Sequence, residues 1–223
     1  MEDSKKRVII IFSFLYMVAL IFALKVHDVG MIGPEFTTIG LSKLNNWFRH
    51  LWHYNEELGY FKFWYIFVQV LGYFSLVPCV FWTVLFVREL INAKSLDGVG
   101  VDKNLMATFF LYIITVLFCC FYKLIPVNYG PIILPGKTKI SASFPAFHVV
   151  IIIISWASTI FHVSDLLGQK KKLVLFLHIL FTAIMAIGIF GCMICGIYWF
   201  TDILGGLLFC ITLIPLYSFF FDI

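Results

Sequence analysis

Residues 173–194 read LVLFLHILFTAIMAIGIFGCMI, a run of 22 residues without Asp, Glu, Lys or Arg. A helix needs about 20 consecutive apolar residues to cross ~30 Å of hydrocarbon, so this run predicts a transmembrane helix. The composition of the whole chain agrees, since 62% of its 223 residues are hydrophobic, 13% are charged and the mean hydropathy is +1.00. Soluble domains carry about 25% charged residues. The chain therefore has too little polar surface for a water-exposed globule.

Five further runs meet the same length criterion. The six predicted spans are residues 8–24, 63–87, 105–122, 145–163, 173–194 and 199–220. The second contains Pro78, which a membrane helix tolerates when neighbouring groups satisfy the freed carbonyl. The fold class is predicted to be all-α, a polytopic bundle of six transmembrane helices in a single membrane domain over residues 1–223. The first span follows a basic stretch but has no small-x-small cleavage site, which favours a signal anchor.

The basic residues predict the orientation of the bundle. With a cytoplasmic N-terminus, nine of the 16 Lys and Arg residues fall on the inner side. The cluster at Lys170–Lys172 is the stronger indication, because basic residues weigh most in short connections. An even number of spans then returns the C-terminus to the cytoplasm. We expect an integral protein of the cell (plasma) membrane with both termini cytoplasmic.

Two connections are long enough to have structure of their own. Residues 42–55 are predicted to form an outer amphipathic helix with Ser42 as its cap. Its apolar residues recur at i, i+3, i+4 and i+7, namely Leu41, Leu44, Trp47, Phe48, Leu51 and Trp52. Such a helix suits the membrane–water interface; whether it packs over the bundle or gates access stays open here. Residues 123–144 are rich in Pro and Gly and predict a loop.

The cysteines and the net charge exclude some functions. Cys192 and Cys195 form a C-x-x-C near the end of an apolar run. A structural zinc site would need further ligands in polar surroundings, so we expect packing and no metal or cofactor. A disulfide across the outer face is the alternative. The net charge of +4 is small and scattered, and therefore predicts no nucleic-acid partner.

Polar residues within membrane spans are costly, so each is a candidate functional residue. Lys123, His148 and Asp202 fall at the outer ends of the third, fourth and sixth predicted spans. The topology thus places all three on one side of the membrane, where they could converge. His178 lies inside the fifth span, and we interpret it as a helix-packing histidine.

Three stretches surround those residues: KLIPVNYGP at 123–131, SFPAFH at 143–148 and GCMICGIYWFTDILGG at 191–206. In order and spacing they resemble the three motifs of the type 2 phosphatidic acid phosphatase superfamily, membrane-embedded lipid phosphatases with six helices. The resemblance covers residues 120–210. It implies the six-helix fold of that family, and the topology given above puts the site on the outer side of the membrane.

The resemblance implies roles for three matching residues. Lys123 corresponds to a lysine that holds the phosphate. His148 corresponds to the histidine that protonates the leaving alcohol. Asp202 corresponds to the aspartate that orients the nucleophilic histidine four residues before it.

Other motif positions depart from the family. Position 198, the nucleophile in the family, is Tyr198. Gly130 and Cys192 stand where the family has its two phosphate-binding arginines, and Ala146 stands where it has serine. Tyrosine has an ordinary pKa near 10 and is a weak nucleophile at pH 7. We expect its hydroxyl to donate to Asp202 across one helical turn.

The sequence therefore predicts a catalytically degenerate member that is not an enzyme. It would bind a membrane lipid, such as an isoprenoid or glycerolipid phosphate, in transport or beside a membrane protein partner. Losing the nucleophile and both guanidinium groups removes the electrostatics on which phosphoryl transfer depends. Two alternatives remain: an active phosphatase of lipid phosphates or diphosphates at the outer leaflet, and a purely structural membrane subunit.

Overall fold

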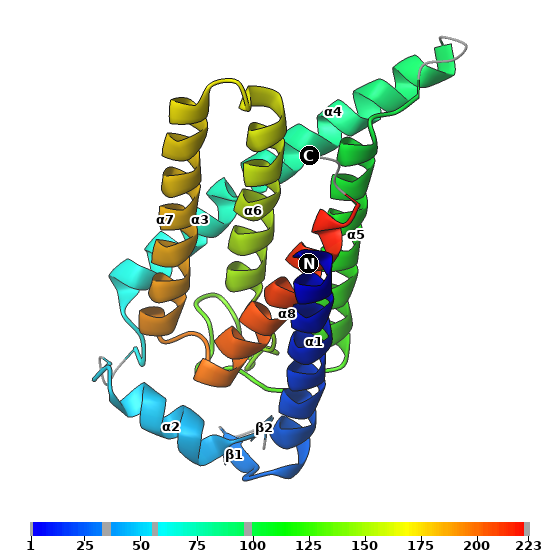
Figure 1. The fold of residues 1–223 in the computed structure, drawn as a ribbon. Helices are drawn as coiled ribbons and strands as arrows, with labels where there is room; N and C mark the ends of the chain where they lie inside the picture. The colour runs from blue at the N-terminus through cyan, green and yellow to red at the C-terminus, as the bar shows by residue number, and fades with distance from the viewer. Residues whose placement is uncertain (1, 33–36, 55–57, 96–99, 221–223) are drawn as a thin grey trace.

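The computed structural model describes residues 2–32, 37–54, 58–95 and 100–220, and these residues form an all-α bundle with one short hairpin (Figure 1). Its elements are α1 (Glu2–Val26), β1 (Gly30–Ile32), β2 (Thr37–Ile39), α2 (Ser42–His50), α3 (Lys62–Phe74), α4 (Leu76–Ser95), α5 (Lys103–Leu124), α6 (Phe147–Leu167), α7 (Lys171–Cys195) and α8 (Phe200–Ser218). The two strands pair antiparallel, with Met31 opposite Thr38.

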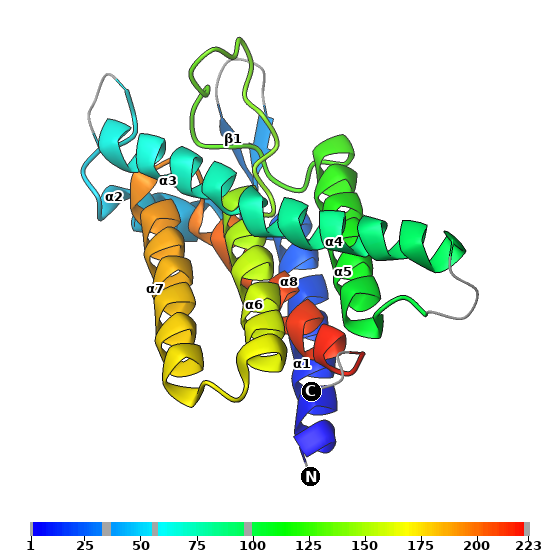
Figure 2. The same cartoon turned by 90° about the horizontal axis from the view of Figure 1, so that it is seen from above.

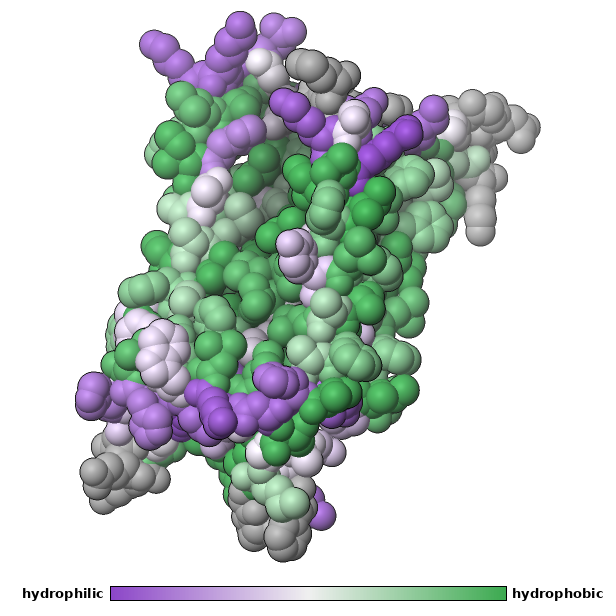
Figure 3. Space-filling model, turned by 60° about the horizontal axis from the view of Figure 1, so that its bottom comes forward, coloured by the Kyte–Doolittle hydropathy of each residue, from purple (hydrophilic) through white to green (hydrophobic). Residues whose placement is uncertain are grey.

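Six candidate membrane spans lie within the described part of the chain, because α3 and α4 together make one continuous apolar stretch, Lys62–Ala93. The predicted polytopic membrane bundle of six helices is therefore confirmed. A broad band of apolar side chains lies between two polar margins on the face seen in Figure 3. That band is the surface expected for a bundle surrounded by hydrocarbon.

The helices pack as neighbouring pairs. The helix pair α6 and α7 runs side by side, and α1 runs along α8 (Figures 1 and 2). The described parts of residues 27–61, residues 125–146 and the turn at 196–199 lie at one end of the bundle, which we call the motif end (Figure 2). The start of α1, the end of α8 and the turn between α6 and α7 lie at the opposite end. His178 of α7 contacts α6 near this turn, because its Nε2 lies 2.8 Å from Ser164 Oγ.

The second span is interrupted at Ser75, between the end of α3 and the start of α4. Pro78 lies in the first turn of α4, where the missing N–H costs nothing. Ser155 of α6 donates its hydroxyl to the carbonyl of Ser75, and the indole of Trp156 donates to Ser75 Oγ at 2.9 Å. These bonds satisfy the carbonyl and the hydroxyl of Ser75, where α3 ends. The combined span crosses the bundle obliquely, which accommodates its length of 32 residues (Figures 1 and 2).

The predicted outer helix is α2, Ser42–His50; residue 55, the predicted end, lies outside the described residues. Ser42 is not its cap, contrary to the sequence expectation. Leu41 occupies the N-cap position, and Asp28 Oδ2 accepts from the amide of Lys43 at 2.6 Å. The sequence pattern missed this because the capping carboxylate comes from outside the helix, next to β1.

Helix α2 packs on the start of α8 rather than over the middle of the bundle. The rings of Phe48 and Phe200 lie 4.8 Å apart. Arg49 donates to the carbonyl of Gly196 at 2.8 Å and to that of Gly59, and its guanidinium lies over the rings of Tyr54 and Trp199. Burial lowers the pKa of Arg49 from its ordinary value. These contacts fix α2 to the turn that precedes α8.

Candidate functional site

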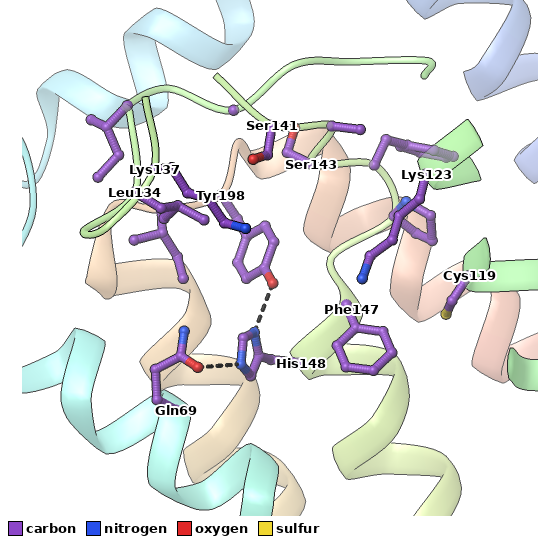
Figure 4. A pocket seen from close by; sticks show the side chains of 16 residues that line it. Gln69, Cys119, Lys123, Leu134, Lys137, Ser141, Ser143, Phe147, His148 and Tyr198 are labelled. Atoms are coloured by element: carbon purple, nitrogen blue, oxygen red, sulfur yellow. Dashed lines mark hydrogen bonds between the residues drawn. The ribbon is translucent and has the colours of Figure 1, made fainter. Parts of the chain in front are cut away.

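A cavity of about 440 Å³ opens at the motif end, between α3, α5, α6, the 125–146 connection and the turn before α8 (Figure 4). Several polar side chains face it: Gln69, Lys123, Lys137, Ser141, Ser143, His148 and Tyr198. No α2 residue is among those recorded in its lining within the described chain. That observation favours a packing role for α2 over the gating role that the sequence left open.

His148 is held on both sides by hydrogen bonds. Its Nδ1 lies 2.7 Å from the hydroxyl of Tyr198, and its Nε2 lies 3.3 Å from Gln69 Oε1 (Figure 4). Because the Gln69 oxygen accepts, Nε2 carries the ring proton, and Nδ1 accepts from the tyrosine hydroxyl. Both ring nitrogens of His148 thus have protein hydrogen-bond partners.

Tyr198 lies in the turn between α7 and α8. Burial raises the pKa of its hydroxyl well above the ordinary value of 10. The phenol therefore stays protonated at neutral pH and acts as a hydrogen-bond donor. A protonated phenol that donates to its neighbour is a poor nucleophile.

Gly72 of α3 lets His148 occupy its position. A Cβ at residue 72 would lie 2.6 Å from Cδ2 of the imidazole. The two helices approach so closely here that a larger residue would displace the ring. The sequence of α3 therefore determines where His148 sits in the cavity.

Two lysines face the cavity from different elements. Lys123 comes from the last turn of α5, and Lys137 from the connection that follows (Figure 4). They approach from opposite sides, with both ammonium ends towards the middle of the cavity. Lys123 Nζ also lies 5.2 Å from the centroid of the Phe147 ring. The described residues that line the cavity include no Asp or Glu, so its fixed charge is positive.

Asp202 lies behind the cavity, fully buried in the first turn of α8. Its carboxylate accepts from Asn128 Nδ2 at 3.1 Å and from the amide of Trp199 at 3.2 Å. The expected bond from Tyr198 to Asp202 is wrong, because the tyrosine bonds to His148 instead. The helix begins at Phe200, so Tyr198 and Asp202 do not share a helical face.

Asp202 belongs to a buried polar network that joins three segments. Asn128 also accepts from the amide of Gly40 at 2.9 Å, and Asn45 of α2 donates to Thr201 Oγ1 at 2.9 Å. Asn45, Asn128, Thr201 and Asp202 are all fully buried. Because each has hydrogen-bond partners, the network stabilises the motif end without facing a ligand.

Comparison with solved structures adds the fold relationship. The chain is similar to a transmembrane PAP2 type phosphatidylglycerolphosphate phosphatase from Bacillus subtilis, with a TM-score of 0.65, 13% sequence identity, and coverage of 95% of this chain and 94% of that chain. The fold is PAP2-like. Neither a protein-family model nor a curated protein matches the sequence. At this identity the likeness extends to the fold, and the residues of the site must be read from the chain itself.

The PAP2-like fold places the remaining motif positions at different depths. Gly130 lines the cavity, and a Cβ there would meet other atoms at 3.5 Å or more. Ala146 is fully buried as the N-cap of α6, and its amide donates to the carbonyl of Asp202 at 2.9 Å. Cys192 is fully buried in α7 and is not recorded in the lining.

The cysteines of the described residues are all free thiols, so the alternative of a disulfide between Cys192 and Cys195 is wrong for this structure. Cys195 Sγ instead donates to the carbonyl of Cys192 at 3.3 Å. Within the residues described, no group of three His, Cys, Asp or Glu side chains could hold a metal ion.

Sequence reasoning missed Gln69, Lys137 and Asn128. Gln69 could have been identified as a candidate site residue, since it is an uncharged polar residue inside a long apolar span. Lys137 carried none, because a loop rich in Pro and Gly has no periodicity that predicts where its side chains point. Asn128 lies inside the first motif, but its partners come from the start of α8 and from Gly40, which no local pattern links to it.

Proposed function

We propose that this PAP2-like protein binds the anionic headgroup of a membrane lipid in the cavity and does not hydrolyse it. The hydrogen bond of 2.7 Å between Tyr198 and His148 carries the proposal. In the phosphatase motifs that the chain resembles, the position that corresponds to residue 198 is a nucleophilic histidine. A protonated phenol stands there instead, and it occupies a nitrogen of the histidine expected to protonate the leaving group.

The charge of the cavity supports an anionic ligand. Lys123 and Lys137 place two ammonium groups around a space without a lining carboxylate in the described chain, and Ser141 adds a hydroxyl. A cleft lined by one sign of charge raises the local concentration of ligands with the opposite sign. A phosphate monoester or diphosphate, as in glycerolipid or isoprenoid phosphates, has the charge and the acceptor oxygens that such a cavity suits.

The same residues argue against turnover. Phosphoryl transfer is accelerated by positioning and by charge stabilisation of the transition state. Removing one such donor costs about 3–4 kcal/mol. Gly130 and Cys192 supply none of the guanidinium contacts that the phosphatase motifs have at these positions. Lysine offers a point charge and cannot form the bidentate contact of arginine.

We infer that the motif end faces outward from the cell (plasma) membrane, with both termini cytoplasmic. The turn between α6 and α7 carries Lys170, Lys171 and Lys172 at the opposite end from the cavity. Clusters of this kind are retained on the cytoplasmic side. The ligand would then be a lipid of the outer leaflet, and a membrane protein partner could deliver or receive it.

The test measures phosphate release and lipid binding on the same purified protein in nanodiscs. With phosphatidate and undecaprenyl diphosphate, we expect no phosphate above background, while a functional PAP2-type phosphatase releases it under the same conditions. Binding of phosphatidate should exceed that of diacylglycerol. The variant Lys123→Met with Lys137→Met should lose about tenfold or more of that affinity, whereas Lys139→Met, on the same connection, should not.

Two outcomes would replace the proposal. Robust phosphate release that is abolished by His148→Ala would show that Lys123 and His148 work with another nucleophile, and the lipid phosphatase alternative would then hold. Equal and weak retention of phosphatidate and diacylglycerol, unaffected by the double lysine variant, would favour the purely structural membrane subunit.

A further inference from the structure

A second, smaller cavity of about 190 Å³ adjoins the first and runs between α3 and α6. We call it the side groove. Gln69, Phe147 and His148 line both spaces. The remaining lining of the side groove comes from Gly72, Tyr73, Leu76 and Ile151. The side groove therefore continues the headgroup cavity past the imidazole and along the two helices.

The side groove opens on the apolar flank of the bundle. Tyr73 is 70% exposed and Leu76 is 38% exposed, although both belong to a membrane-spanning stretch. The neighbouring side chains of α3 and α4, such as Val70 and Val77, are exposed as well. In a bilayer these residues contact hydrocarbon, so the side groove joins the charged cavity to the lipid phase.

The polarity of the lining changes along this path. The cavity contains the two lysines, Ser141 and Tyr198, whereas beyond His148 the side groove is lined by apolar and aromatic residues with one amide, that of Gln69. This order, from charged to apolar, matches the order of groups in an amphiphile that carries a headgroup on a hydrocarbon chain.

Gly72 leaves space for the side groove beside His148. A Cβ at this position would meet the imidazole at 2.6 Å, so the absence of a side chain is what leaves room for both the ring and the side groove. Leu76, the first residue of α4, also lines the passage. The passage is bounded by two helices, which suits one extended hydrocarbon chain.

We infer that the lipid bound through its phosphate in the cavity passes a hydrocarbon chain through the side groove, between α3 and α6, into the membrane. This inference rests on the proposed function, because it assumes that the headgroup occupies the lysine-lined cavity. It adds the route of the chain and makes Leu76, Tyr73 and Ile151 the residues that select it.

The first test separates the chain from the headgroup. Leu76→Trp fills the side groove, and Val77→Trp places the same bulk on the adjacent lipid-facing surface. We expect Leu76→Trp to weaken binding of dioleoyl phosphatidate about tenfold and to leave binding of glycerol 3-phosphate unchanged. Val77→Trp should match the unmodified protein for both ligands, and Lys123→Met should weaken both.

The second test locates the chain in the unmodified protein. A phosphatidate that carries a diazirine in one acyl chain should label peptides containing Tyr73, Leu76 or Ile151 more strongly than those around Ile179 of α7. The excess should disappear in Lys123→Met. If Leu76→Trp binds dioleoyl phosphatidate normally and the labelling is even, the chain route is wrong while the headgroup site stands. If the unmodified protein binds neither phosphatidate nor glycerol 3-phosphate, both proposals fail.

Discussion

The hydroxyl of Tyr198 lies 2.7 Å from Nδ1 of His148, and this bond joins the turn before α8 to the first turn of α6. In the phosphatase motifs both positions hold histidines with opposite chemical tasks. Here the tyrosine hydroxyl donates a hydrogen bond to the imidazole instead. Both side chains thereby have a hydrogen-bond partner without a ligand, which stabilises the half-buried imidazole at the motif end.

Positions 130 and 192, which correspond to arginines in the phosphatase motifs, should differ in the substitutions that they tolerate. Gly130→Arg places its side chain in the cavity and should change the free energy of unfolding by no more than about 0.5 kcal/mol. Cys192→Arg puts a charge where the residue is 0% exposed, and should cost more than about 4 kcal/mol. Thermal unfolding in detergent measures both. Phosphate release by the triple variant Tyr198→His, Gly130→Arg and Cys192→Arg would contradict this expectation.

Alkaline pH should destabilise the protein through Tyr198. Its folded pKa is raised well above 10 by burial, so the folded state keeps a proton that the unfolded state loses. The stability contributed by this group is present below about pH 10 and is lost as the pH rises further. Between about pH 9 and pH 11, the melting temperature of Tyr198→Phe should fall less steeply than that of the unmodified protein. Tyr16→Phe, at an exposed tyrosine of α1, is the control; equal slopes in all three proteins would refute the assignment.

The buried side-chain amide of Asn128 should contribute more to the free energy of unfolding than an exposed asparagine amide does. Asn128→Leu removes one of the donors to the Asp202 carboxylate and the side-chain acceptor of the Gly40 amide, and should lower the free energy of unfolding by about 2–3 kcal/mol. Asn46→Leu makes the same change on the exposed side of α2 and should have little effect. Similar unfolding temperatures for the two variants would mean that the network does not stabilise the motif end.

Alanine substitutions at two glycines would distinguish the cost of backbone strain from the cost of a steric contact. Gly136 and Gly196 both have positive φ, at +79° and +86°. A Cβ at Gly136 would meet nothing within 4 Å, whereas one at Gly196 would lie 2.7 Å from Tyr54. Gly136→Ala should therefore cost about 1 kcal/mol, and Gly196→Ala clearly more. Removing the ring with Tyr54→Ala should make the additional cost disappear; an unchanged cost would place its origin elsewhere.

Cysteine labelling in intact cells tests the orientation. In a background without the native cysteines, a cysteine at Lys171 should resist an impermeant maleimide, because the short basic turn is expected in the cytoplasm. A cysteine at Lys139, at the motif end, should react. Reversed labelling would place the cavity on the cytoplasmic side and move the proposed ligand to the inner leaflet.

The spans were predictable from the sequence because the requirement is simple: about 20 apolar residues must be continuous along the chain. The convergence of Lys123 and His148 followed from counting spans, since both lie at ends that face the same side. Asp202 was assigned to the wrong partner because its bonds depend on where α8 begins. Tyr198 lies in the turn before the N-cap Trp199, so it does not share a helical face with Asp202.

Lys137 and the α3–α6 side groove were beyond sequence reasoning for another reason. The position of Lys137 depends on the course of a loop, and the side groove depends on the crossing of two helices 79 positions apart at Gln69 and His148. Contacts between residues so far apart along the chain produce no periodic pattern in the sequence. Gly72 illustrates this, because its meaning appears only once His148 is placed beside it.

The bond between Asn45 and Thr201 joins residues 156 positions apart. Asn45 belongs to the first connection after α1, whereas Thr201 opens the last of the six spans described. The bond of Asn45 to Thr201 can therefore form only when the last helix is in place beside the early segment. The cavity at the motif end also depends on that helix, because the turn that carries Tyr198 leads directly into it. Placement of α8 is thus what closes the motif end of the bundle around the early connection.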